Sequence, residues 1–211
     1  MYNEMLKNRI EAGILLSERL KKYRNTNSVV LAIPRGGVPI GAIIAKNLQL
    51  QLDIVLSKKI GHPQNKEFAI GAVSMDAMII DKYSEIPTAY IDEEIIKLRK
   101  LLQEKYKLYM HQHKPIDIKG KNIIIVDDGI ATGNTLLVSI AMLRKKQPAK
   151  IIVAVPILPY EAIQTFEENA DELIYLIASK NFRAVGHFYE EFNPVEDPEV
   201  IQLLLNTNPN Q

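Results

Sequence analysis

Short, fully apolar runs separated by longer amphipathic segments are the feature that most limits how this chain can fold. Residues 29–33 (VVLAI), 122–126 (NIIIV) and 151–156 (IIVAVP) are rich in branched apolar residues and lack the alternation of a half-exposed strand. Such runs are typical of strands that are covered on both faces. Because helical segments separate them, the chain is expected to form an α/β fold, a mostly parallel twisted sheet with helices on both faces.

The remaining elements follow the same alternation. We expect further strands at residues 52–56, 69–74, 78–80 and 172–177, helices at 5–23, 38–48, 91–111, 135–146 and 160–169, and a closing helix that Asp197 begins. Residues 57–68 are mostly polar, which predicts a loop. No linker divides the chain, so we expect a single domain over residues 1–211. Its core would span about 28–178, with an N-terminal helix at about 4–24 and a small hood or C-terminal segment at about 179–206.

Charge and composition exclude several function classes. The net charge of +1 gives no overall field for nucleic acid or an anionic membrane, so neither is expected as a partner. The absence of cysteine excludes disulfides, thiolate catalysis and sulfur-ligated metals. No apolar run approaches the length of a membrane span, and the N-terminus lacks the apolar core of a signal peptide. We therefore expect a soluble, cytoplasmic protein in which any anion site is local.

The sequence IIIVDDGIATGNT at residues 123–135 carries the clearest chemistry. Gly129 and Gly133 permit close backbone approach, and Thr135 opens a helix whose first N–H groups lack partners within the helix. Such a turn is a good nest for a phosphate monoester. The stretch does not contain the Walker pattern, and G-x-G-x-x-G is absent as well, so a nucleoside triphosphate or a dinucleotide is not expected.

Asp127 and Asp128 would repel a phosphate, so we expect them to hold another part of the same ligand. Paired carboxylates accept hydrogen bonds and suit a vicinal diol or a divalent cation. A ribose 5-phosphate combines a diol with a phosphate at this spacing. The alternative is structural, a tight strand-to-helix turn in which Asp128 caps the helix.

Two further polar clusters follow predicted strands. Arg35 supplies a cationic fork and precedes Gly36 and Gly37, whose backbone N–H groups are unobstructed, while Lys58 and Lys59 follow the next strand. Ligands of such sheets bind beyond the carboxyl ends of the strands, so these groups would meet the aspartates there. A second, more highly charged anion such as pyrophosphate would match them. Taken singly, each cluster could also be an ordinary turn or a solvated lysine pair.

These residues carry a resemblance to a known family. IIIVDDGIATGNT is similar to the phosphoribosyl-pyrophosphate motif of the type I phosphoribosyltransferases, and AIPRGGVPIGAIIAKNL resembles their pyrophosphate loop and following helix. The similarity in layout runs from about residue 29 to residue 177. SKKIGHPQNKEFAIGAV resembles an uncharacterised bacterial subgroup of that family.

The resemblance implies an enzyme of nucleotide metabolism. It would be a Mg²⁺-dependent glycosyltransferase that moves the 5-phosphoribosyl group from phosphoribosyl pyrophosphate to a nitrogenous base. The Mg²⁺ would be held mainly by the substrate, with no direct protein ligand, and the chain would form a homodimer. The implied roles are catalysis for Asp127, Asp128, Lys58 and Lys59, binding of the 5′-phosphate for Gly129, Ala131, Thr132, Gly133, Asn134 and Thr135, and binding of pyrophosphate for Arg35, Gly36 and Gly37.

The acceptor base is not identified by the sequence. Members of the family that use 6-oxopurines have an aspartate where this chain has Ala131, which argues against hypoxanthine or guanine. By analogy, a hood would hold the base, and Phe182, Phe188 and Tyr189 are candidates to stack on it. The alternative is that these aromatic residues form a small apolar core.

Two other functions stay open at this point. The chain could be a non-catalytic regulatory protein that senses phosphoribosyl pyrophosphate or a nucleotide. It could also be a phosphoribosyl-pyrophosphate hydrolase or have a phosphorylase-like activity. A transferase needs an added acceptor base for turnover, and this requirement distinguishes it from the hydrolase or phosphorylase-like activity.

Overall fold

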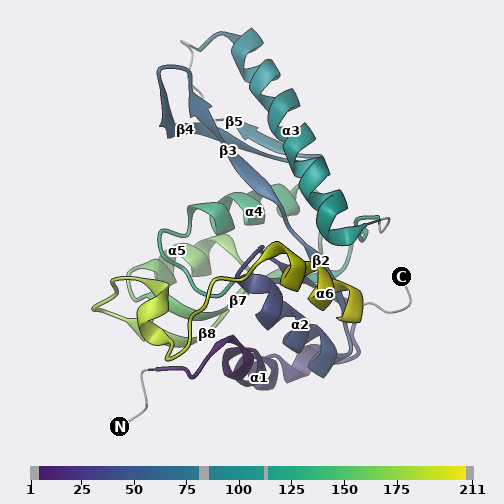
Figure 1. Ribbon diagram of the computed structural model, residues 1–211, viewed down its shortest axis with the longest axis vertical. Coiled ribbons are helices and arrows are strands. Elements are labelled where there is room, and N and C mark those ends of the chain that lie inside the picture. Colours follow the sequence, from purple (N-terminus) through teal and green to yellow (C-terminus); the bar gives the residue numbers. More distant parts are fainter. Residues whose placement is uncertain (1–4, 81–85, 112–113, 208–211) are drawn as a thin grey trace.

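A computed structural model describes residues 5–80, 86–111 and 114–207. Figure 1 shows two lobes, which we call the body and the arm. The body is built on five parallel strands in the order β2-β1-β6-β7-β8. These strands are β1 (Ser28–Ala32), β2 (Gln51–Ile54), β6 (Asn122–Val126), β7 (Lys150–Pro159) and β8 (Glu172–Ser179). The expected α/β fold with a mostly parallel sheet is confirmed.

Helices cover both faces of this sheet, which explains the uniformly apolar strands. Along β6, Ile124 and Val126 pack in one core cluster, whereas Ile123 and Ile125 pack in another. The first cluster contains residues of α1, α2 and α6, and the second contains residues of α4 and α5. These helices are α1 (Arg9–Arg19), α2 (Gly37–Leu48), α4 (Asn134–Arg144), α5 (Ala162–Asn169) and α6 (Asp197–Thr207). Short 3₁₀ helices lie at Lys21–Tyr23 and Val185–Phe188.

The arm is an antiparallel sheet that packs on one long helix (Figure 1). It consists of β3 (Ser57–His62), β4 (Asn65–Ser74), β5 (Met78–Ile80) and α3 (Thr88–Met110). Ile60, Ile70 and Val73 pack against Ile95 and Leu102 of α3 and form a separate small core. The apolar side chains of the arm's sheet are therefore buried on the arm's own helix, whereas Tyr106, Tyr109 and Met110 at the end of α3 pack in the core of the body.

The arm corrects one expectation from the sequence. The polar stretch at residues 57–68 is not a loop but forms a hairpin with residues 69–74, which pair antiparallel with β3 and not with the parallel sheet. The polar composition misled this interpretation, because the hairpin has one face toward α3 and lysines on its exposed surface. The two strands joined by the sharp turn after His62 satisfy each other's backbone N–H and C=O groups, and this pairing does not require an apolar sequence.

Several polar contacts fix the arm to the body. Tyr106 of α3 donates to buried Asp53 at 2.9 Å. At the start of α6, Asp197 accepts from Tyr109 at 2.6 Å and from Lys105 at 3.3 Å. Asp76, in the turn between β4 and β5, forms an ion pair at 2.6 Å with Lys146, which lies just after the C-terminal end of α4.

The N-terminal helix starts later than expected. Residue 4 lies outside the described residues, and α1 begins at Arg9 because the Asn8 side chain caps the N–H groups of Ile10 and Glu11. Ahead of it, Leu6 donates to Phe188 O at 2.8 Å and accepts from Glu190 N at 2.8 Å. The segments near the two ends of the described chain are thus bonded to each other. Within the described ranges, no helix is long and apolar enough to span a membrane.

Candidate functional site

The carboxyl ends of β1 and β6 place two of the predicted motifs together. The strands pair in parallel register up to Ala32 and Val126, so the turn after β1 meets the aspartates that follow β6. A Cβ added to Gly36 would lie 1.9 Å from Asp128 Oδ2, and one added to Gly37 would lie 2.5 Å from Val126 O. At Gly37 the contact is with backbone, so a side chain there would force the chain to move, whereas a side chain at Gly36 would displace the Asp128 carboxyl group.

The turn into α4 has the form expected of an anion nest. Gly133 adopts φ +75°, in the left-handed region, and its Cα lies against the Phe166 ring. Leu137 makes the first bond of the helix, to Gly133 O at 2.9 Å, which leaves the N–H groups of the preceding three residues without partners in the helix. The residues predicted to hold a phosphate at this turn include Ala131, Thr132, Asn134 and Thr135, which are all exposed.

The two aspartates differ in their surroundings. Asp127 Oδ1 accepts from the Asp128 backbone N–H at 2.8 Å, and Asp128 Oδ2 accepts from Arg9. Burial, reinforced by the neighbouring Asp128 carboxylate, raises the pKa of Asp127 to about 8. Burial at this position therefore favours the neutral form of the Asp127 carboxyl group.

Arg9 is a residue of this site that the sequence reasoning missed. Its Nε and Nη2 donate to the single oxygen Oδ2 of Asp128 at 3.0 and 2.7 Å. Arg9 precedes Asp128 by 119 residues and lies in a helix that showed only amphipathic spacing. Nothing in the sequence marks this contact, because only the fold brings α1 to the end of β6.

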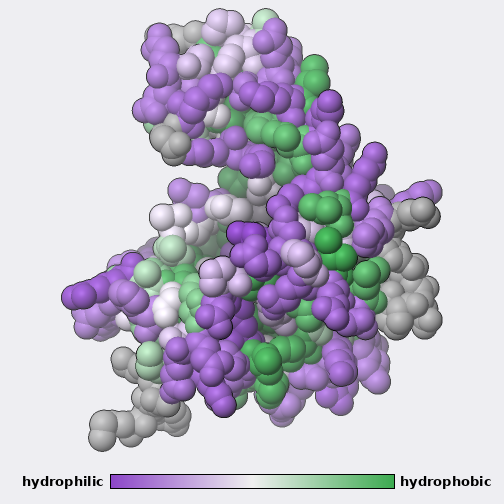
Figure 2. Space-filling model, in the orientation of Figure 1, coloured by the Kyte–Doolittle hydropathy of each residue, from purple (hydrophilic) through white to green (hydrophobic). Residues whose placement is uncertain are grey.

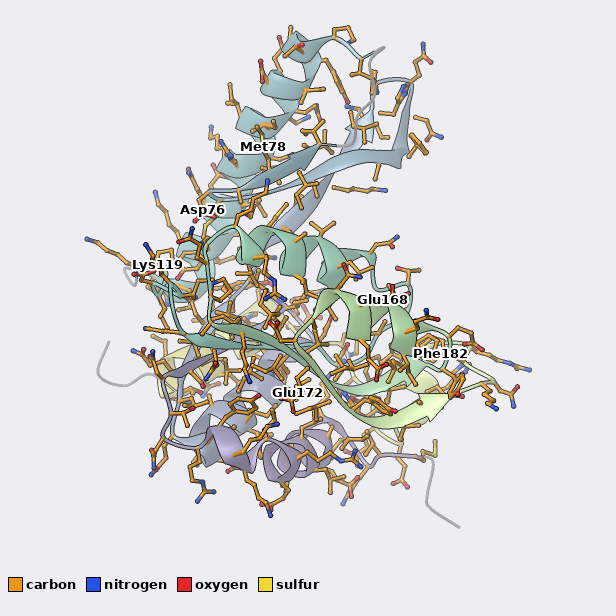
Figure 3. All side chains as sticks on the ribbon, turned by 180° about the vertical axis from the view of Figure 1, so that it is seen from behind. Asp76, Met78, Lys119, Glu168, Glu172 and Phe182 are labelled. Atoms are coloured by element: carbon orange, nitrogen blue, oxygen red, sulfur yellow. The ribbon has the colours of Figure 1, made fainter. Side chains whose placement is uncertain are left out.

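The aromatic residues proposed for the acceptor are packed in the body. Phe188 and Tyr189 are buried, and the Tyr189 hydroxyl donates to Asp128 O at 2.8 Å. Phe182 is half-buried and stacks on Phe188 with ring centroids 5.7 Å apart. Figure 3 shows Phe182 at the edge of the body, beyond the end of β8. The alternative of a small apolar core thus describes Phe188 and Tyr189, while an acceptor role for Phe182 stays a prediction.

The predicted cations do not gather around the aspartates. Arg35 lies 3.4 Å from Glu196 and 3.8 Å from Asp197, at the start of α6, with 46% of its side chain exposed. Lys58 and Lys59 line a cavity of about 420 Å³ between the arm and α4, together with Asn134 and Thr135. Figure 2 shows the hollow between the two lobes. Among the described residues, the lining of this cavity has two lysines and no carboxylate, so it favours an anion.

The carboxylates present suit a cation that a substrate carries. In the described parts of the chain, no group of three or more His, Cys, Asp or Glu residues could hold a metal ion. Asp128 already pairs with a cationic side chain. Asp127 and Asp128 offer the oxygen donors that Mg²⁺ prefers, and a Mg²⁺ held mainly by the substrate stays a prediction.

Comparison with known proteins matches this geometry. The family described as "Phosphoribosyl transferase domain" matches residues 2–191. The chain belongs to this phosphoribosyl transferase family. A Mycobacterium tuberculosis relative named "Putative phosphoribosyl transferase MT0597" is 32% identical over 206 residues, which are 95% of this chain and 46% of the relative. The chain thus spans about half the length of the curated relatives that it matches over most of its length.

Two further similarities concern a solved structure and a shorter stretch of the chain. The crystal structure of TT1426 from Thermus thermophilus superposes with a TM-score of 0.85 at 33% identity, covering 96% of this chain and 98% of that one. A ribose-phosphate pyrophosphokinase of Pyrococcus furiosus is 42% identical over 60 residues, which are 28% of this chain and 22% of that enzyme. The match to TT1426 covers the arm as well as the body, so the arm is part of a shared fold.

Proposed function

We propose that this phosphoribosyl transferase family member transfers the 5-phosphoribosyl group of phosphoribosyl pyrophosphate to a nitrogenous base and releases pyrophosphate. The observation that carries the proposal is the junction after β6, where two carboxylates and a glycine-bounded helix start lie in one turn against Gly36. The 5′-phosphate would bind at the start of α4, and the ribose hydroxyls would bind Asp127 and Asp128. The pyrophosphate would bind at the backbone of Gly36 and between the lobes. The Gly37 N–H, which was expected to be unobstructed, donates to Ile33 O at 3.0 Å and is not part of this proposed site.

The charges support this chemistry. Breaking the bond at C1 builds positive charge on the ribose and negative charge on the leaving group. The aspartate pair on one side and fixed N–H and lysine donors on the other would stabilise both, and removing one such donor typically costs about 3 kcal/mol of barrier. When bound, Mg²⁺ supplies further charge neutralisation at the leaving pyrophosphate. Ala131 offers no carboxylate to the base, so we propose an acceptor other than a 6-oxopurine.

The experiment begins with calorimetric titration of phosphoribosyl pyrophosphate with and without Mg²⁺. A panel of bases is then added and release of pyrophosphate is followed. Magnesium-dependent binding together with base-dependent release supports the transferase and names the acceptor class. Release without any base indicates a hydrolase. Binding without release for every base favours the sensor, and no binding contradicts the proposal.

A further inference from the structure

Arg9 holds one of the two aspartates more firmly than a surface ion pair would. Besides its two hydrogen bonds to Asp128, Arg9 Nη1 donates to Asn193 O at 2.8 Å, and its guanidinium carbon lies 4.0 Å from the centroid of the Phe192 ring. The side chains of Arg9 and Asp128 are only 12% and 17% exposed. Partly buried, multiply bonded pairs of this kind are much less weakened by solvent than exposed pairs.

The backbone around Arg9 is fixed from both ends of the chain. Asn8 caps α1, and Leu6 pairs with Phe188 and Glu190 of the C-terminal segment. Tyr189 of the same segment bonds to the backbone of Asp128 and stacks on Phe192 at 5.0 Å. The guanidinium therefore sits where α1, the C-terminal segment and the end of β6 meet.

The bonds from Arg9 also determine which carboxyl oxygens of Asp127 and Asp128 are left to meet a ligand. Both of its bonds go to Asp128 Oδ2, and the Asp128 N–H engages Asp127 Oδ1. In the described part of the chain, these bonds engage one oxygen of each carboxyl group, Oδ1 of Asp127 and Oδ2 of Asp128. One oxygen of each remains to meet a ligand, which is what two adjacent hydroxyl groups require.

We infer that Arg9 is a positioning residue of the sugar site, which fixes Asp128 so that one oxygen of each aspartate is presented to the vicinal hydroxyls of the ribose. The inference rests on the proposed function, since it names what orders the proposed sugar-binding acids. Arg9 does not touch the reacting atoms in this arrangement. It acts through Asp128, and its charge lowers the pKa of Asp127.

The charged and titratable groups around the pair are Arg9 from α1 and Tyr189 from the C-terminal segment. Asp127 has its pKa raised by burial and by Asp128, whereas its own bond from the Asp128 N–H and the charge of Arg9 lower it. Removal of the Arg9 charge should therefore raise the pKa of Asp127 further. A role that is merely structural would not move this titration in step with ligand affinity.

The test compares Arg9→Gln and Arg9→Lys with Arg19→Gln as a matched control. Arg19 lies at the other end of α1 and donates to Tyr175 O at 2.7 Å, so its substitution also removes an arginine–carbonyl bond from this helix. The probe is phosphoribosyl pyrophosphate with Mg²⁺, titrated calorimetrically from pH 6 to pH 9, with thermal unfolding measured in parallel.

We expect Arg9→Gln to weaken binding about tenfold or more, because a misplaced binding group loses most of its interaction. Arg9→Lys should recover part of the loss, since it keeps the charge but not the paired donors. The pH at which affinity changes should move upward in Arg9→Gln and stay in place in Arg19→Gln.

Two results would overturn the inference while leaving the proposed function standing. Unchanged affinity in Arg9→Gln, with or without a lower melting temperature, would make Arg9 a structural clamp. Tighter binding in that variant would show that Arg9 competes with the ligand for Asp128. Wild-type protein that does not bind the probe at all would instead contradict the proposed function, and the inference with it.

Discussion

Gly36 and Asp128 are in such close contact that the carboxylate occupies the place of a side chain. A Cβ built on Gly36 would lie 1.9 Å from Asp128 Oδ2 and 2.4 Å from its carboxyl carbon. Gly36 itself has φ −60° and ψ −32°, which any residue adopts. The glycine is therefore required by the contact with Asp128 and not by its own backbone conformation.

Gly36→Ala should consequently displace the Asp128 carboxylate without straining the backbone. We expect affinity for phosphoribosyl pyrophosphate to fall by about 10- to 100-fold, as for other small misplacements in binding sites. Gly120→Ala is the contrasting control, because Gly120 has φ +68° and nothing within 4 Å of an added Cβ. That variant should lose about 1 kcal/mol of stability and keep its affinity. Equal affinity in both variants would remove Asp128 from the sugar site.

Asp127 should make the stability of the fold depend on pH. Its pKa is about 8 in the folded protein against an ordinary value of 3.8, so the folded state binds the proton more tightly than the unfolded chain. Its contribution to the free energy of unfolding is therefore largest below about pH 4, falls as the pH rises and levels off above about pH 8.

Asp127→Asn should remove this part of the pH dependence. The amide has the same shape, is never charged and still offers an oxygen to the Asp128 N–H. We expect the variant to exceed wild type in stability by on the order of 2 kcal/mol at pH 9, and by less at pH 5. Denaturant unfolding at the two pH values measures the difference. A difference between wild type and variant that is the same at both pH values would contradict a pKa of Asp127 near 8.

Much of this arrangement was predictable from the sequence, and the reasons are local. The apolar runs identify the five body strands, and the glycines and aspartates after residue 126 define the turn that follows β6. The hairpin at residues 57–74 was not predictable, because its lysines, glycines and small residues resemble a loop. Neither was the pairing of Arg9 with Asp128, since it depends on how α1 packs beside the end of β6.

Arg35 was predicted to face pyrophosphate, whereas in the structure it pairs with acids at the start of α6. Because these pairs are exposed, Arg35→Ala should change the free energy of unfolding by less than about 1 kcal/mol. Affinity for phosphoribosyl pyrophosphate should nevertheless fall about tenfold if the guanidinium turns to the ligand. Glu196→Gln, which weakens the competing pair, should bind at least as tightly as wild type. Wild-type affinity in Arg35→Ala would assign this arginine to α6 alone.

We expect the hydrogen bond between Asp53 and Tyr106, which joins the body to the arm, to contribute strongly to the free energy of unfolding. It is 3% exposed and accepts from Tyr106 Oη at 2.9 Å, Ile116 N at 2.9 Å and Ile54 N at 2.7 Å. Burial raises the pKa of Asp53, while these donors lower it. The carboxylate thus depends on each donor, since a buried charge that loses a partner is strongly destabilising.

Tyr106→Phe removes one of these donors and should lower the free energy of unfolding by about 1–3 kcal/mol. Tyr109→Phe is the matched control on α3, because its partner Asp197 is more exposed and keeps Lys105. The loss in Tyr106→Phe should grow from pH 5 to pH 8, since removal of the donor raises the pKa of Asp53 further and makes its ionised form costlier to bury. Denaturant unfolding of both variants at the two pH values measures this. Equal losses in the two variants, independent of pH, would show that Asp53 does not hold the arm to the body.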